Sequence, residues 1–312
     1  MSKEAERKLK AIGNYHLGGR CLGKGSFARV ELATHMAMGV KVALKIIHKP
    51  TLLKDKYFKR HLLREQKILS RLSHPNIVRL FEVCHSSDIY CLVLEYVESS
   101  LLDRVVAKDK LNERESQAIC GQLASALDYL HDVGIIHRDL KLENVLISDA
   151  DRVVLIDFGL SNSWFSGKTM KTHCGSAEYA SPELFTKDAN YGPGVDVWSF
   201  GVIMYTILVG SMPFQTANSE SLDGGVSSSE DLMDLIVLVK RGLGPKHFRQ
   251  MSALSLDCRA LLLRCLNVDQ RSRIRMKSVL NDPWIRDHAT EYHENSPAKE
   301  KQVAGSVEDG VV

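Results

Sequence analysis

The spacing of apolar residues changes once along this chain of 312 residues, and that change constrains the fold more than any other feature. From Tyr15 to Tyr96 most segments are short and strand-like. In one of them, residues 40–47 (VKVALKII), alternation places Lys45 on the same face as Ala43. Beyond Tyr96, apolar residues recur at helical spacing. We therefore predict an α+β fold with two lobes: a small β-rich N-lobe with one main helix, and a larger, mostly α-helical C-lobe.

The expected domain boundaries follow from where this periodicity begins and ends. We expect a flexible lead over residues 1–13, one domain over residues 14–288 and a disordered tail over residues 289–312. The lobes divide at residues 14–96 and 97–288. We expect two more strands at residues 77–83 and 89–96, and a capped helix at residues 112–130. A buried helix is expected at residues 196–210 and a polar loop at residues 215–231.

Charge and cysteine usage narrow the class of protein. The chain has 41 Lys and Arg against 38 Asp and Glu, a balance too even to indicate binding to nucleic acid or to a membrane surface. Its seven scattered cysteines lack zinc-site spacing, which indicates reduced thiols. The charged start and the lack of a long apolar segment predict neither a secretory signal nor membrane insertion. We expect a cytoplasmic protein, with the nucleus as a second location.

One helical stripe interrupts the strand-like part, from Phe58 to Leu72. Glu65 falls on its apolar face, where a carboxylate without a partner would be costly to bury. Lys45 on the neighbouring strand could be an ordinary solvent-facing lysine. Pairing it with Glu65 would instead satisfy both charges and aim the ammonium at phosphate oxygens.

A glycine-rich turn joins two of the strand-like segments. Residues 23–28 read GKGSFA, and glycines let backbone amides approach phosphate groups without a Cβ in the way. Taken alone, such a turn is more often an ordinary hairpin. The chain has no Walker-type phosphate loop, which argues against a nucleoside triphosphatase of the P-loop class.

The strongest motif is HRDLKLEN at residues 137–144, after the end of a predicted helix. Asp139 would orient an incoming hydroxyl group and accept its proton, and Lys141 would neutralise charge on a migrating phosphoryl group. Asn144 would supply a neutral oxygen ligand to Mg²⁺. A second carboxylate, Asp157, follows the apolar run 153–156 as part of the tripeptide DFG. At the end of a buried strand it would be well placed to bind Mg²⁺ that bridges phosphates.

Together these motifs resemble the eukaryotic protein kinase family over residues 14–288. The resemblance is strongest to the calcium/calmodulin-dependent-kinase group, among relatives of AMP-activated protein kinase such as the microtubule-affinity-regulating, salt-inducible and hormonally upregulated neu-associated kinases. The segments that carry it are LGKGSFARVELA, REQKILSRLSHPNIVRL, HRDLKLENVLI, LIDFGLSN, MKTHCGSAEYASPEL and YGPGVDVWSFGVIMYTILVGSMPF. It implies a monomeric catalytic domain that transfers the γ-phosphoryl group of ATP, with Mg²⁺ or Mn²⁺, to serine or threonine hydroxyls of protein substrates.

The resemblance also implies roles for individual residues. Lys45 and Glu65 would form the family's ion pair, and Leu94 would be the gatekeeper before the hinge groups of Glu95 and Val97. Further ATP contacts would come from the glycine-rich loop, from the side chains that sandwich the purine and from one acidic residue: Leu22, Gly23, Lys24, Gly25, Ser26, Phe27, Ala28, Arg29, Val30, Ala43, Leu146 and Glu143. A spine linking the lobes would be formed by Leu69, Leu80, His137 and Phe158. Asp196 would hold the backbone of the catalytic loop, and Arg273 would pair with Glu183.

By the same resemblance, Asp157 to Glu183 would be an activation loop. Thr172 would be phosphorylated there by an upstream kinase, unless it is an unmodified loop threonine. Arg138 offers a bidentate partner for the phosphate, and their pairing would order the loop. Ser176 would lie in the groove beside the substrate hydroxyl and favour serine and threonine over tyrosine.

Several positions depart from the family pattern. Ala28, Ser181 and Ala177 replace a glycine, an alanine and a proline, all mild changes. After the hinge, Ser99 and Ser100 replace two glycines and one position is missing, together with the acidic residue that contacts ribose and a basic substrate residue. Glu98 or Asp103 could replace it, and Glu143 remains as an acidic contact for Arg or Lys upstream of the phosphoacceptor.

This departure leaves room for a pseudokinase that only binds ATP. A small-molecule kinase is a further alternative, although the segment from Thr172 to Glu183 resembles a platform for protein substrates.

Overall fold

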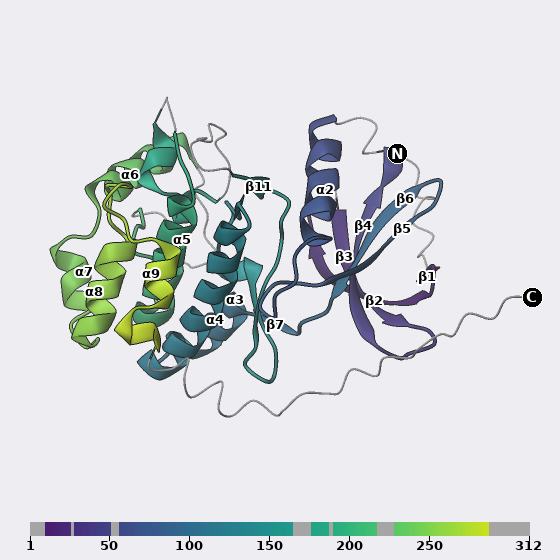
Figure 1. Cartoon of the computed structure of the whole chain (residues 1–312), viewed down its shortest axis with the longest axis horizontal. Coiled ribbons are helices and arrows are strands. Elements are labelled where there is room, and N and C mark those ends of the chain that lie inside the picture. Colours follow the sequence, from purple (N-terminus) through teal and green to yellow (C-terminus); the bar gives the residue numbers. More distant parts are fainter. Residues whose placement is uncertain are drawn as a thin grey trace, which may run out of the picture.

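The computed structural model describes residues 10–25, 28–50, 56–164, 176–186, 190–216 and 228–286, with only the backbone over 56–58. Most strands gather in one part of the molecule and most helices in the other, with helix α2 beside the strands (Figure 1). The expected α+β fold with two lobes is therefore confirmed. The predicted tail, most of the predicted lead and most of the loop at 215–231 lie outside the described residues.

The N-lobe is built on a six-stranded sheet in the order β1-β2-β3-β4-β6-β5, and every neighbouring pair is antiparallel. Its strands are β1 (Ala11–Ile12), β2 (Tyr15–Lys24), β3 (Ala28–His35), β4 (Lys41–His48), β5 (Leu80–His85) and β6 (Ile89–Glu95). The predicted alternation in β4 is observed. Val42, Leu44 and Ile46 enter one apolar cluster, and Ile47 enters another.

Helix α2 (Lys56–Leu69) is the main helix of the N-lobe. Leu62 packs against Ile47 and Leu92, so its apolar face lies on the sheet. Glu65 is on the buried side and only 3% exposed. Leu72 lies beyond the end of the helix, so the predicted stripe was one turn too long.

The strand predicted at residues 77–83 begins later than expected, at Leu80. Ile77 instead forms an isolated parallel bridge with Leu155 of the other lobe, and the Val78 amide donates to the Leu155 carbonyl at 3.0 Å. A local pattern cannot distinguish a sheet partner from this crossing contact, because both need an extended apolar backbone.

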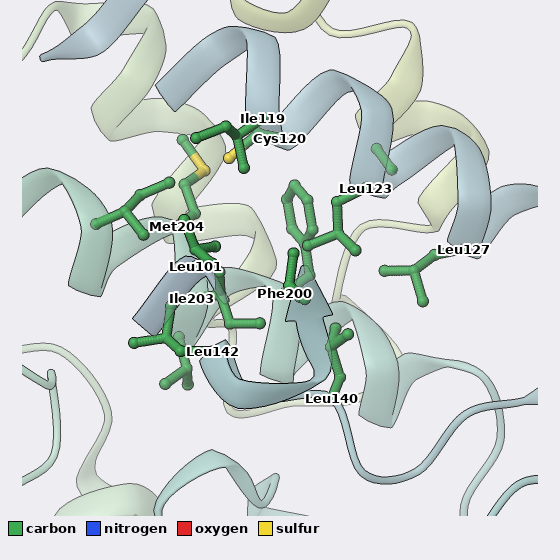
Figure 2. Close-up of a cluster of buried hydrophobic side chains, with 14 of the residues drawn as sticks. Leu101, Ile119, Cys120, Leu123, Leu127, Leu140, Leu142, Phe200, Ile203 and Met204 are labelled. Carbon is green, nitrogen blue, oxygen red and sulfur yellow. The ribbon is translucent and has the colours of Figure 1, made fainter. Parts of the chain in front are cut away.

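The C-lobe is mostly helical and holds the larger core. Its helices are α3 (Leu101–Lys108), α4 (Glu113–Asp132), α5 (Gly194–Val209), α6 (Ser229–Arg241), α7 (Pro245–Gln250), α8 (Leu256–Cys265) and α9 (Met276–Leu280). Figure 2 shows Ile119, Leu123 and Leu127 of α4 facing Phe200 and Met204 of α5. All five side chains are at most 2% exposed, so burying them contributes strongly to stability.

The ends of two predicted helices are set by local signals in the sequence. Asn112 precedes α4 and its side chain accepts a hydrogen bond from the Glu115 amide at 2.9 Å. Helix α5 is capped after Val209 by Gly210, which adopts a left-handed conformation with φ of 84°. A Cβ at Gly210 would also lie 2.7 Å from the Asp109 carbonyl oxygen, so this position requires glycine.

Short elements between α4 and α5, together with one strand before α3, surround the polar motifs. One small sheet has the order β10-β9-β7, from Val153–Leu155, Val145–Ile147 and Ser99–Ser100. Another pairs β8 (Ile135–Ile136) with β11 (Asn162–Ser163). Single 3₁₀ turns lie at Leu142–Asn144, Ala177–Tyr179 and Pro182–Phe185. Across the described part of the chain, none of the helices combines the length and apolar character needed to cross a membrane.

We expect Gly201→Ala to destabilise the protein by about 1–3 kcal/mol, the usual cost of overpacking a core. A Cβ at Gly201 in α5 would lie 2.9 Å from the Cβ of Cys265 and 3.0 Å from Leu266, which outweighs the higher helix propensity of alanine. Urea unfolding measures the change. Gly121→Ala in α4 is the matched control, because its Cβ would make an ordinary 3.7 Å contact with Ile285. Equal midpoints for the two variants would contradict the packing argument.

Candidate active site

Lys45 of β4 connects three parts of the molecule through its ammonium group. Its Nζ lies 2.6 Å and 2.9 Å from the two carboxylate oxygens of Glu65 and 3.4 Å from Oδ1 of Asp157. Burial alone would lower the pKa of Lys45, but the two carboxylates outweigh it and raise the pKa. Lys45 is therefore a fixed positive charge at neutral pH, in contact with both α2 and the loop after β10.

The loop after β10 is held from both lobes. The Lys45 ammonium lowers the pKa of Asp157, whose Oδ1 also accepts from the Gly159 amide at 3.2 Å. His61 of α2 donates to the Gly159 carbonyl at 2.9 Å. Asp157 has a φ of 60°, a left-handed value that few residues other than glycine adopt. The Asp157 side chain is still 45% exposed, so it can reach a ligand.

The four residues predicted to form a spine lie in the same core. Phe158 and His137 meet edge to face, with ring centroids 5.0 Å apart, and both are fully buried. Leu69 belongs to the same apolar cluster, and Leu80 packs against it. His137 also donates to the Ile156 carbonyl at 3.0 Å. These contacts join α2 and β5 to the two loops that carry Asp139 and Asp157.

Asp139 is surrounded by donors that hold its carboxylate in place. Oδ1 accepts from the amide and the hydroxyl of Ser176, each at 3.3 Å. Oδ2 accepts from Asn144 Nδ2 at 3.2 Å and lies 4.0 Å from Lys141 Nζ. The four predicted residues therefore converge, and the oriented carboxylate could accept a proton from a hydroxyl group.

Asp196 at the start of α5 fixes the backbone of this loop, in the position that the resemblance implied. Its carboxylate accepts from the amides of His137 and Arg138, each at 2.9 Å, and from His131 Nε2 at 2.9 Å. Burial would raise the pKa of Asp196, but these hydrogen bonds lower it, so it remains ionised. Arg138 has a φ of 70°, a strained conformation that these bonds maintain.

Asn144 and Asp157 fit the requirements of Mg²⁺. Asn144 Nδ2 donates to the Asp139 carbonyl at 2.7 Å, which leaves the amide oxygen for another partner. The Ile156 amide donates to the Asn144 carbonyl at 2.9 Å and keeps the two loops together. Across the described residues, no three or more His, Cys, Asp and Glu side chains gather to hold a metal by themselves. A site with one carboxylate and one amide suits Mg²⁺, which usually retains water and substrate phosphates as its other ligands.

Sheet register brings the predicted ATP-contacting residues together. Gly23 pairs with Val30, and Val30 pairs with Lys45, so the start of the glycine-rich loop lies two strands from Lys45 in the same sheet. Ala43 pairs with Leu94 at the hinge end of the sheet. The turn closes through a bond from the Gly25 amide to the Ala28 carbonyl at 2.8 Å. Leu22, Lys24, Arg29 and Glu143 are at least partly exposed, whereas Ser26 and Phe27 lie outside the described residues.

Glu95, at the start of the predicted hinge, contacts two arginines. The Glu95 amide donates to the Arg79 carbonyl at 2.9 Å, so this amide is already used, and the Glu95 carboxylate pairs with Arg152. Val97 is buried, and Leu146 pairs with Ser100 below the hinge.

The departure after the hinge has a clear structural consequence. Ser100 caps α3, and Asp103 returns a bond to the Ser100 amide at 2.9 Å, which forms a capping box. The Asp103 carboxylate is therefore engaged within its own helix. Glu98 is exposed, which favours it over Asp103 as a replacement for the missing acidic contact.

The remaining predicted residues lie around the activation segment. Arg273 pairs with Glu183 through two bonds of 2.6 Å and 2.9 Å. Arg138 donates through Nε to the Leu160 carbonyl at 2.7 Å and through Nη1 to the Tyr191 hydroxyl at 3.1 Å. Thr172 lies outside the described residues, so its pairing with Arg138 stays a prediction.

Sequence reasoning missed three residues that hold this site: His61, His131 and Tyr191. Each makes its polar contact with a residue at least 53 positions away. A lone histidine or tyrosine within a helix or loop carries no signal of such a contact. Only the folded topology brings the partners together.

Comparison with known proteins gives a consistent result. The family described as protein kinase domain matches residues 16–285. The SNF1-related protein kinase catalytic subunit alpha KIN12 of Arabidopsis thaliana is 38% identical over 314 residues, covering 99% of this chain and 59% of the relative. The carbon catabolite-derepressing protein kinase of Saccharomyces cerevisiae is 37% identical over 281 residues, covering 90% of this chain and 41% of the relative. The chain thus spans about half the length of these curated relatives. Both the site geometry and the match over most of its length show that the chain belongs to the protein kinase family.

Proposed function

We propose that this chain is a serine/threonine protein kinase that transfers the γ-phosphoryl group of ATP to hydroxyl groups of protein substrates. The observation that carries the proposal is the Lys45 ammonium, 2.6 Å from Glu65 and 3.4 Å from Asp157. An ammonium held between two carboxylates is fixed in position and stays charged, as phosphate binding requires. The names of both relatives, each a protein kinase, support the same function.

The chemistry follows from the groups around Asp139. Asp139 would accept the proton of the substrate hydroxyl while the hydroxyl oxygen bonds to the γ-phosphorus. The bond between the γ-phosphorus and ADP breaks, and ADP keeps the electron pair. Lys141 would offset charge on the moving phosphoryl group, and Ser176 would keep Asp139 oriented. Asp157 and Asn144 would hold Mg²⁺, or Mn²⁺ in its place, which when bound neutralises the phosphates. Most of the rate gain would come from positioning and charge neutralisation.

Regulation would act through the activation segment. We infer that an upstream kinase phosphorylates Thr172, and that the phosphate binds the guanidinium of Arg138, the residue before Asp139. Phosphate carries nearly two negative charges at neutral pH, and a guanidinium binds it in bidentate fashion. This pairing would order the segment between Asp157 and Glu183.

Other properties of the protein stay proposals of the same kind. The catalytic domain would extend over residues 14–288, act as a monomer and work in the cytoplasm, and also in the nucleus. Its partners would be protein substrates and the upstream kinase, not nucleic acid. The exposed Glu143 and Glu98 favour substrates with Arg or Lys upstream of the phosphoacceptor.

The test is transfer of labelled phosphate from ATP to a positional-scanning peptide array with serine, threonine or tyrosine at the centre. We expect label on serine and threonine, none on tyrosine, and none above background with Lys45→Met, which removes the ammonium but keeps much of its apolar stem. The proposal fails if the wild type, phosphorylated on Thr172, does no better than Lys45→Met. ATP binding without transfer would indicate a pseudokinase, and label on free metabolites but on no peptide would indicate a small-molecule kinase.

A further inference from the structure

Trp164 lies directly after β11, where the described first part of the activation segment ends. Its amide donates to the Gly134 carbonyl at 2.6 Å, which extends the pairing of β11 with β8 by one residue. A Cβ at Gly134 would lie 2.7 Å from the Trp164 carbonyl oxygen, and Gly134 has a φ of 73°. Gly134 therefore does more than end a helix, because its lack of a side chain lets the Trp164 backbone approach.

The indole ring of Trp164 rests on a second glycine. A Cβ at Gly192 would lie 3.5 Å from Trp164 Nε1 and 3.7 Å from Cε2, so the ring covers the side of Gly192 from which a side chain would project. The ring packs against an apolar cluster of Ile136, Tyr191 and Val195. Trp164 is thus fixed both to the strand before the catalytic loop and to the segment before α5.

The same cluster supports Arg138. Tyr191 is 1% exposed, and its hydroxyl accepts from Arg138 Nη1 at 3.1 Å. The other side of the guanidinium donates to the Leu160 carbonyl, four residues before Trp164. Arg138 is 8% exposed and directly precedes Asp139, so a displaced Arg138 would also displace the backbone of Asp139. The Trp164 ring thus packs against the cluster that contains Tyr191, and Tyr191 bonds to Arg138. Arg138 in turn bonds to Leu160, which precedes Trp164 by four residues.

We propose that Trp164 is a positioning residue for catalysis: its ring keeps the Tyr191 hydroxyl against Arg138 and so holds the loop that carries Asp139. This inference rests on the proposed kinase function. A ring that only covers apolar surface would contribute to stability but not to kcat, because its loss would leave Arg138 bonded to Tyr191. A ring that acts through Tyr191 should lose its effect once the Tyr191 hydroxyl is removed.

The first experiment is a double-mutant cycle in the full chain with Trp164→Ala and Tyr191→Phe. We expect each single variant to lower kcat roughly 10- to 100-fold, as small misplacements of catalytic groups do, with little change in KM for ATP. The double variant should be no slower than the slower single variant, because both act on one contact. Trp164→Phe, which keeps a ring, should recover most of kcat. The inference is overturned if Trp164→Ala keeps the wild-type kcat, or if the losses multiply in the double variant.

A second experiment tests the packing of the Trp164 ring on Gly192 and does not require an active enzyme. The chain has three tryptophans, and Trp198 and Trp284 are at most 3% exposed, so quenching of emission by acrylamide reports mainly on Trp164. Gly192→Val should displace the ring, increase quenching and lower kcat. Gly192→Ala, whose methyl group makes an ordinary contact, should match the wild type in both. Unchanged quenching in Gly192→Val would overturn the inference. An inactive wild type with the expected quenching would overturn the proposed function, while the packing of the Trp164 ring on Gly192 would stay supported.

Discussion

Asp139→Asn is expected to lower the rate of phosphoryl transfer by roughly 10²- to 10⁴-fold, the range lost with a positioned general base. Asparagine has the size of aspartate but cannot accept a proton from the substrate hydroxyl. An NH2 group also replaces one of the two side-chain oxygens, so a donor then faces either the Ser176 amide or Asn144 Nδ2. Asn144 keeps its bond to the main-chain carbonyl of residue 139 at 2.7 Å, so its predicted role as a metal ligand should persist.

Single-turnover transfer to a peptide, with Thr172 phosphorylation matched by mass spectrometry, measures this effect. ATP affinity is measured separately and should stay close to that of the wild type, because the predicted nucleotide contacts belong to Lys45, the glycine-rich loop and the hinge. Asp149→Asn is the matched control, since Asp149 is exposed on the turn after β9. A parallel loss of transfer and of ATP binding would show that Asp139 acts on the nucleotide site rather than as a base.

The sequence was sufficient to predict the site wherever chemistry and local pattern coincide. Lys45 and Glu65 could be paired because a charge on each apolar face requires a partner, and the two meet at 2.6 Å. Asp139 and Asn144 are five residues apart, so one loop brings them together at 3.2 Å. Helix α5 could be predicted because its apolar run ends in Gly210, which alone suits the left-handed cap.

Prediction failed where a contact depends on the topology. Ile77 was predicted to be part of a strand, yet its partner is Leu155 in the other lobe. His131 and Asp196 are 65 residues apart and meet only because α4 packs beside α5. The capping role of Asp103 could have been read from Ser100 three residues earlier, since that spacing forms a box at helix starts. The sequence pattern after the hinge instead indicated Asp103 as a possible replacement for the missing acidic contact.

These differences share a physical cause. Pairings within one turn or one loop are decided by spacing alone, whereas Tyr191 and Arg138 are 53 residues apart and meet only in the folded chain. The strained backbone of Arg138 belongs to the same class, because no local preference of arginine favours a positive φ. Arg138 depends on a tertiary contact with Asp196 to hold that conformation. The parts of the site that sequence reasoning missed are therefore those that hold the catalytic groups in position.

Arg273→Gln is expected to destabilise the protein by about 3–5 kcal/mol, the cost of removing one partner from a buried ion pair. The Arg273 side chain is fully buried and forms two bonds to Glu183, at 2.6 Å and 2.9 Å. It also donates to the carbonyls of Gly194 and Asn267, and its guanidinium lies 5.1 Å from the centre of the Trp198 ring. Glutamine cannot supply the charge or reach all of these partners, so Glu183 would be left buried and negative.

Urea unfolding followed by circular dichroism measures this change, with Arg275→Gln as the matched control because that arginine is exposed two residues away. The control should change stability by no more than about 0.5 kcal/mol, as surface substitutions do. The double variant Arg273→Met with Glu183→Leu should recover part of the loss, because no charge then remains buried, but not all of it, because the two carbonyls stay without a donor. If Arg273→Gln unfolds at the same urea concentration as Arg275→Gln, the pair contributes nothing, and the join between the activation segment and α5 must depend on apolar packing alone.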